Sequence, residues 1–147
     1  MSIVRASSSL PFVSKITYVD GVPMLDGGIA DSIPVQYALD QGYEKLVVIL
    51  TRNKGYRKKE GKMRIAKAFY RKYPALQQAL SVRNLRYNQT MDLIERLESE
   101  GRITVIRPIN PVEVGCIEKD TAKLTALYQE GYSVASDLLN NIPCDLL

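Results

Sequence analysis

A single carboxylate followed at once by two glycines is the feature of this sequence that most suggests chemistry. Asp26 comes directly after an apolar residue, Leu25, and directly before Gly27 and Gly28. Glycine adopts backbone angles that are closed to other residues and lets the backbone pass close to another group. The pattern is typical of an acid presented at the end of a strand, where it can act as a base. A turn carboxylate that caps the next helix is the alternative interpretation.

The rest of the composition narrows the chemistry open to this carboxylate. The 147 residues contain no histidine, which excludes a Ser-His-Asp triad, a Cys-His pair and a histidine metal site within this chain. The two cysteines, Cys116 and Cys144, show no metal or redox spacing and are expected to be ordinary thiols. We therefore expect neither a metal nor a cofactor.

Length and hydropathy place the chain among soluble globular proteins. With 147 residues, 46% of them apolar and 24% charged, it can form one domain with a core. It lacks a run of about 18 apolar residues that could span a membrane. Its first ten residues also lack the long apolar stretch of a signal peptide. These observations predict a cytoplasmic location.

The elements that would position Asp26 are a hairpin before it and a helix after it. Apolar residues alternate over 15–19 and 22–25 on either side of Asp20-Gly21, a pair that favours a tight hairpin turn. The second arm of this hairpin delivers Asp26 just past its end. Asp31 or Ser32 is then expected to cap a helix over Ile33–Leu39.

Strands and helices alternate in the remainder of the sequence. Five consecutive aliphatic residues within Lys45–Thr51 are typical of a parallel strand buried on both faces, and Arg102–Arg107 is a second candidate. Helical spacing of apolar residues predicts a long helix over 74–99 and another from Asp120 or Thr121 onward. The segment 62–73 favours a shorter helix.

The predicted fold class is therefore α/β, with three layers and a short parallel sheet flanked by helices. The parallel strands are expected near Ile3, at 45–50 and at 103–106, beside the small hairpin at 15–25. Such a sheet needs cover on both faces and a protected edge.

Positive charge is concentrated in one segment. Residues 52–72 hold ten Lys and Arg against one acidic residue, a net charge of +9, which leaves −5 for the remainder. This segment is either a solvated charged face or a surface for anionic lipid headgroups or substrate phosphate. Nucleic acid is not the expected partner, because no binding motif accompanies the charge. The residues expected to contact an anion or lipid are Arg52, Lys54, Arg57, Lys58 and Lys59, with Tyr56, Phe69, Tyr70 and Tyr73 as interfacial anchors.

Several of these motifs together resemble the second half of patatin-like phospholipases, in particular bacterial members described as predicted patatin-like esterases. The most specific are Arg5–Phe12, with its three serines before Leu-Pro, and Leu25–Val35, which contains the Asp-Gly-Gly box. Gly55–Lys58, Tyr73-Pro74 and Arg83–Asn88 also match, so that the resemblance extends over most of the chain.

The resemblance implies an acyl-ester hydrolase with a Ser-Asp dyad, acting on lipid or other acyl esters. The position of Asp26 matches the family's catalytic aspartate, which activates the serine without a histidine, and Gly27 and Gly28 would form the active-site loop. An acyl-serine forms, and water then releases the fatty acid. The alternative is a non-catalytic module that binds an anionic or lipid surface through residues 52–72.

The nucleophile of that family is not found in this sequence. It lies in a Gly-x-Ser-x-Gly elbow upstream of the Asp box, and few residues precede Arg5. Residues 1–147 are therefore expected to be the C-terminal part of a patatin-like acyl hydrolase domain, inactive alone and prone to self-association. Gly131–Ala135 imitates the elbow, but Ser133 falls within a helical pattern instead of a strand-to-helix turn.

Overall fold

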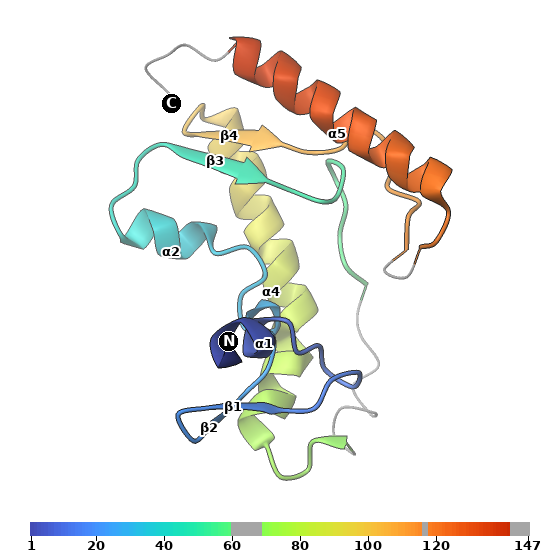
Figure 1. Cartoon of the computed structure of the whole chain (residues 1–147). Helices are drawn as coiled ribbons and strands as arrows, with labels where there is room; N and C mark the ends of the chain where they lie inside the picture. Colours follow the sequence, from blue (N-terminus) through green and yellow to red (C-terminus); the bar gives the residue numbers. More distant parts are fainter. Residues whose placement is uncertain (60–68, 116–117, 142–147) are drawn as a thin grey trace. The chain divides into compact units, whose positions relative to one another are not determined.

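The computed structural model describes residues 1–59, 69–115 and 118–141, and it has a mixed α/β composition, as predicted (Figure 1). The chain divides into two compact units. Unit 1 comprises Met1–Pro34 and Arg57–Asp92, and unit 2 comprises Val35–Tyr56 and Leu93–Leu147. Cys116, Cys144 and most of the short helix predicted over 62–73 lie outside the described residues.

Unit 1 begins with a helix where the sequence predicted a strand. α1 spans Ser2–Ser7, and its N–H groups bond carbonyls of the same segment. The hydroxyls of Ser8 and Ser9 reinforce it by donating to carbonyls four residues earlier. The parallel strand predicted near Ile3 is wrong, because these local bonds satisfy the backbone while Ile3 and Val4 each remain 69% exposed.

The hairpin predicted at 15–25 is confirmed. β1 (Thr17–Val19) pairs with β2 (Val22–Met24) in antiparallel register. Asp20 and Gly21 both have positive φ angles, 50° and 78°, which is the geometry of a turn whose twist matches that of the strands. α1 packs against β1, and the short 3-10 helix η1 (Gly27–Ile29) follows the hairpin.

The long helix is confirmed with its predicted bounds. α4 spans Pro74–Ser99 and contributes residues to both units. Pro74 stands at its first position, where a missing N–H costs nothing. At its end Gly101 has a φ of 70°, its N–H donates to Glu98, and the next N–H donates back to Leu97. These two bonds satisfy carbonyls that the end of the helix would otherwise leave unpaired.

Unit 2 contains the parallel pair. β3 (Leu46–Ile49) pairs with β4 (Ile103–Ile106), Leu46 lying opposite Ile103. α5 (Thr121–Asn141) packs beside β4, and Figure 1 shows it running alongside the pair. The expectation that the first strand is buried on both faces is wrong, because β3 has one partner strand in the described sheet and its Ile49 remains 72% exposed.

A short helix precedes this sheet. α2 (Val35–Asp40) matches the helix predicted over Ile33–Leu39, although it starts two residues later. Asp31 accepts a hydrogen bond from the N–H of Ile33 (3.1 Å), so it closes the turn before α2. The hydroxyl of Ser32 instead donates backward to the carbonyl of Gly28 (2.8 Å).

Candidate functional site

Asp26 lies where the sequence placed it, just past the second arm of the hairpin. It is half-buried, and its N–H donates to the carbonyl of Ser9 (2.9 Å). Its carboxylate Oδ1 accepts a hydrogen bond from the N–H of Gly28 (2.7 Å), and Asp26 thereby caps η1. The capping role considered from the sequence is therefore present locally, and it occupies one of the two carboxylate oxygens.

The second carboxylate oxygen of Asp26 differs from the first in its contacts. Within the described part of the chain, Oδ2 has no hydrogen-bond partner. An ionised carboxylate can accept several hydrogen bonds at its two oxygens. The hydrogen bond from the backbone N–H favours one orientation of the side chain and leaves Oδ2 able to accept a further hydrogen bond. A general base must lie within hydrogen-bond reach of the proton that it takes.

The two glycines after Asp26 differ in their surroundings. A Cβ atom added to Gly28 would lie 3.0 Å from Asp26 Oδ1, whereas one added to Gly27 would meet no atom within 4 Å. A side chain at Gly28 would therefore push the carboxylate out of its hydrogen bond. The sequence correctly indicated a close approach at this pair, and the structure assigns it to Gly28.

Ser9 holds the backbone of Asp26 through its carbonyl oxygen. It is 4% exposed, and its hydroxyl donates to the carbonyl of Arg5 (2.7 Å) and lies 3.0 Å from the hydroxyl of Thr17. These bonds join the end of α1 to β1, and the Ser9 carbonyl then receives the Asp26 N–H. Because its hydroxyl is engaged with other protein groups, Ser9 acts as a support for the loop that carries Asp26.

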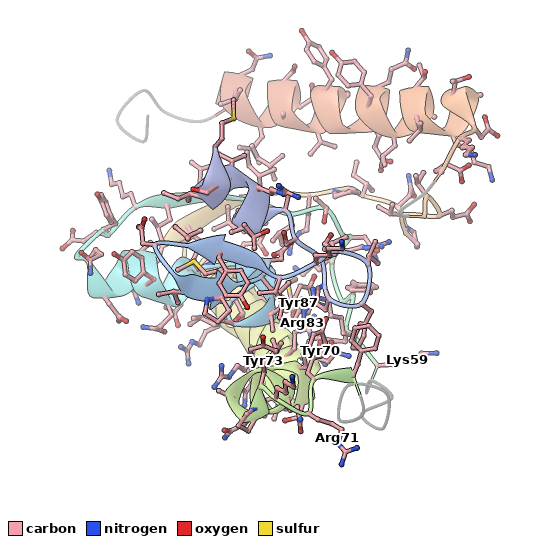
Figure 2. The ribbon with its side chains drawn as sticks, turned by 60° about the horizontal axis from the view of Figure 1, so that its bottom comes forward. Lys59, Tyr70, Arg71, Tyr73, Arg83 and Tyr87 are labelled. Atoms are coloured by element: carbon pink, nitrogen blue, oxygen red, sulfur yellow. The ribbon has the colours of Figure 1, made fainter. Side chains whose placement is uncertain are left out.

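A second support reaches the site from α4. The guanidinium Nε of Arg83 donates to the carbonyl of Gly28 (3.0 Å), the same carbonyl that receives the Ser32 hydroxyl. Arg83 is half-buried and is labelled on α4 in Figure 2. The sequence reasoning assigned Arg83 and Ser32 no role at this carbonyl. The stretch Arg83–Asn88, noted for its resemblance to the family, was the signal that could have drawn attention to Arg83.

Part of the basic segment lies along α4 in unit 1. Asn84, Asn88 and Asp92 follow one another at four-residue spacing, so they share a face of the helix. Asn84 donates to the carbonyl of Lys59 (2.6 Å), and Asn88 bonds both the N–H and the carbonyl of Lys58. Asp92 forms a salt bridge with Arg57 (2.6 Å), which the sequence also predicted to contact an anion.

The side chains of the five predicted anion contacts differ in availability. The Lys58 ammonium lies 3.8 Å from the centre of the Tyr87 ring, and the Arg52 guanidinium lies 5.1 Å from that of Tyr56. Arg52 also donates to the carbonyl of Val112 (3.1 Å). Lys54 and Lys59 are exposed. The structure thus places Arg52 and Lys54 in unit 2 and Arg57, Lys58 and Lys59 in unit 1.

The imitation elbow is part of a helix. Ser133 lies within α5, which runs without interruption from Thr121 to Asn141. An elbow needs a strand before the serine and a sharp turn at it. Ser133 is therefore excluded as an elbow nucleophile, as expected. Among the described residues, no three His, Cys, Asp or Glu side chains gather as metal ligands would.

Two family models match separate parts of the chain. The model described as patatin-like phospholipase matches residues 1–39, which hold α1, the hairpin and the Asp-Gly-Gly box. A model described as a domain of unknown function, DUF6363, matches residues 73–143. The N-terminal segment is therefore similar to patatin-like phospholipases over these residues. The resemblance that extended over most of the chain is corrected in scope, because Gly55–Lys58 and Arg83–Asn88 lie outside the patatin match.

A curated relative is also similar over a short stretch. The uncharacterized protein YjjU of Escherichia coli (strain K12) is 46% identical over 52 residues, which is 35% of this chain. The match spans 15% of the length of that relative. No solved structure matches the chain. Among the described helices, none is both long and apolar enough to cross a membrane.

Proposed function

We propose that residues 1–39 form the aspartate-bearing part of a serine acyl-ester hydrolase site, in which Asp26 is the base of a Ser-Asp dyad acting on lipid esters. The observation that carries the proposal is the fixed carboxylate of Asp26. One oxygen is held by the Gly28 N–H, and the other has no partner within the described residues. This geometry occurs inside the segment that matches the patatin-like phospholipase model.

The proposed reaction proceeds in two steps. In the first, Asp26 Oδ2 takes the proton of a serine hydroxyl while the serine oxygen attacks the ester carbonyl, and the alcohol leaves with that proton. In the second, Asp26 takes a proton from water, which attacks the acyl-serine and releases the carboxylic acid and the free serine. The absence of histidine from the sequence is consistent with a dyad that transfers the proton directly.

The nucleophilic serine is expected outside these 147 residues. They contain no Gly-x-Ser-x-Gly motif, and Ser133, the nearest imitation, lies inside α5. Members of a dyad act as a unit, so that one alone contributes little. We therefore expect the 147-residue chain by itself to be inactive on acyl esters, and a longer protein that supplies the serine to be active.

The test starts from the genomic sequence upstream of residue 1. If an in-frame Gly-x-Ser-x-Gly is encoded there, hydrolysis of a chromogenic acyl ester is measured on the full reading frame. Asp26→Asn is expected to lower kcat/KM by at least about 100-fold, because general base catalysis contributes about 10²–10⁴-fold. Asp31→Asn is the matched control, since Asp31 is an exposed carboxylate of the same loop, and it should leave turnover near the wild-type value.

Two results would contradict this proposal. Unchanged turnover in Asp26→Asn would remove the carboxylate from the mechanism. The absence of any in-frame elbow, together with no hydrolysis by the longest reading frame, would remove the activity itself. Loss of turnover in both variants would point to a folding defect, which circular dichroism of Asp26→Asn detects directly.

A further inference from the structure

Unit 1 displays a cluster of aromatic side chains that the proposed dyad does not use. The rings of Phe12 and Phe69 lie 5.8 Å apart, and each lies 5.3 Å from the ring of Tyr70. Tyr70 is 4% exposed, whereas Phe12 is 45% and Phe69 67% exposed. Val13, next to Phe12, is 82% exposed. A buried tyrosine thus supports two phenylalanine rings that face solvent, which we call the aromatic knob.

The loop that carries Phe12 is held in a strained conformation. Phe12 has a φ of 67°, a left-handed angle that a bulky residue adopts rarely and at a cost in free energy. The Tyr70 hydroxyl accepts a hydrogen bond from the Phe12 N–H (2.9 Å), and the N–H of Ser14 closes the turn on Leu10 (3.0 Å). Ring packing and hydrogen bonds hold the loop in this strained conformation. The exposed position of the Phe12 ring is therefore fixed by the structure around it.

The surroundings of the knob are positively charged. Unit 1 holds twelve Lys and Arg against five Asp and Glu, a net charge of +7, whereas unit 2 has a net charge of −3. Arg71 and Lys72 follow Tyr70 directly in the sequence, and Lys15 follows the turn of residues 10–14 that carries Phe12. All three side chains are exposed. Figure 2 shows Arg71 and Lys59 extending away from the ribbon. Exposed cations therefore stand next to the aromatic residues in the sequence.

We propose that the aromatic knob and its flanking cations form a peripheral docking surface for an anionic phospholipid bilayer. Exposed Phe side chains are among those that enter the boundary between the headgroups and the acyl chains of a bilayer. Clustered Lys and Arg are attracted to anionic headgroups, about fivefold in affinity for each residue near the surface. A bilayer satisfies both features at once, because it offers apolar depth to Phe12 and Phe69 and negative charge to Arg71 and Lys72.

Other occupants fit the observations less well. Nucleic acid would use the cations, and its bases could stack on aromatic rings, but Val13 offers an aliphatic surface that stacking does not need. A second copy of the chain would bring the same positive charge to the contact, which opposes a symmetric pairing at this surface. Charge complementarity therefore favours the anionic bilayer, and the other two partners become outcomes of the test.

The knob is connected to the site described above without depending on it. Its loop begins at Leu10, immediately after Ser9, whose carbonyl receives the Asp26 N–H. Docking through Phe12 would therefore bring a lipid surface to the loop that supports Asp26. Binding to lipid itself needs neither Asp26 nor a serine. The docking surface and the proposed hydrolysis are therefore tested by separate experiments.

The first experiment measures co-sedimentation of the 147-residue chain with vesicles of phosphatidylcholine alone or mixed with phosphatidylglycerol. We expect binding to the anionic vesicles that weakens with added salt. Phe12→Gly combined with Phe69→Ala should lower the affinity by at least about tenfold, given the apolar area removed. Glycine at position 12 also removes the strain of the positive φ. Tyr37→Ala, at a 64% exposed aromatic of unit 2, is the matched control.

The cations have their own pair of variants. Arg71→Gln with Lys72→Gln should reduce binding to anionic vesicles by about 25-fold, at about fivefold for each charge near the surface. Lys119→Gln with Lys123→Gln removes the same charge from unit 2 and should change binding far less. Equal losses in the two double variants would overturn the proposal, because net charge alone would then explain the binding.

The chain also permits a direct test of insertion, because it contains no tryptophan. Phe12→Trp places one reporter on the knob, and Tyr37→Trp places one on α2 as the control. Anionic vesicles should shift the emission of Phe12→Trp to shorter wavelength and leave that of Tyr37→Trp unchanged. An unshifted Phe12→Trp, unchanged binding of the Phe12→Gly and Phe69→Ala variant, or a preference for RNA over anionic vesicles would each overturn the proposal. The proposal would also be overturned if the variant with both Phe12→Gly and Phe69→Ala lost self-association but still bound vesicles.

Discussion

The two units of this chain differ in the interactions that stabilise them. Unit 2 pairs β3 with β4 and buries aliphatic side chains, including Val48, Ile94 and Leu97. Unit 1 has a hairpin with strands of three residues each, and it also buries apolar side chains such as Val19 and Met91. Its loops are held in addition by polar bonds between side chains and backbone, such as Arg83 to Gly28 and Asn88 to Lys58. Unit 2 is thus built as a scaffold, and unit 1 as a support for loops.

The units also differ in charge and in the chemistry they display. Unit 1 has a net charge of +7 and holds both Asp26 and the aromatic knob, whereas unit 2 has a net charge of −3. Binding and catalytic residues are found disproportionately on loops that a rigid scaffold positions. We infer that the candidate functions are concentrated in the less regular unit because its loops are held by specific bonds, which fix a side chain in one orientation.

Core truncations should separate the two units most sharply. Leu97, in unit 2, is 1% exposed, and Met91, in unit 1, is 0% exposed, so that replacing either by alanine should lower the free energy of unfolding by about 2–5 kcal/mol. Hydrogen exchange should show lost protection mainly over unit 2, which holds β3 and β4, in Leu97→Ala and mainly over the described residues of unit 1 in Met91→Ala. Equal loss over both regions in both variants would mean that the units unfold together.

Glycines with positive φ offer a smaller and matched comparison. Gly21 in the hairpin and Gly101 after α4 have φ angles of 78° and 70°, and neither has an atom within 4 Å of an added Cβ. Alanine at either position should cost about 1–2 kcal/mol through backbone strain alone, as measured by chemical denaturation. Gly115→Ala is the control, because Gly115 also has open space but no positive φ. A similar cost in all three variants would exclude strain as the cause.

The smallest expected effect is a pH dependence confined to unit 1. A hydrogen bond between the Tyr18 and Tyr73 side chains, followed by the charge of Tyr73, raises the pKa of Tyr18 above its ordinary value of 10.0. The stabilisation is therefore fully present below pH 10 and is lost as the pH rises through the raised pKa. Ultraviolet titration of tyrosinate should show a late-titrating group that Tyr73→Phe returns to the ordinary range. An unchanged titration in Tyr73→Phe would remove this link between β1 and the start of α4.

Much of the local structure could be predicted from neighbouring residues. Asp20-Gly21 indicated the hairpin, and Pro74 and Gly101 indicated the bounds of α4, because turns and helix ends depend on residues a few positions apart. The strand near Ile3 was predicted wrongly for the complementary reason. A β-branched pair favours a strand only when a partner strand is present, and here the local bonds of α1 prevailed.

The candidate site was predicted in part. The pattern at Asp26 correctly indicated a carboxylate at the end of a hairpin arm and a close backbone approach, which the structure locates at Gly28. Its role as a catalytic base stays a prediction, as do the anion contacts of the basic segment. The partners of Arg57 and Lys58 could not be foreseen, because they lie 35 and 30 residues away along the chain.

The sequence by itself determined the turn and helix signals, the missing histidine, the Asp-Gly-Gly box and the concentration of positive charge. These properties depend on residue type and short spacing alone. The tertiary structure decided which groups support the box, namely Ser9 and Arg83, and it set Phe12 on Tyr70, 58 residues away. Such contacts follow from how distant segments pack, and no local pattern encodes the partner that packing will bring into hydrogen-bond distance.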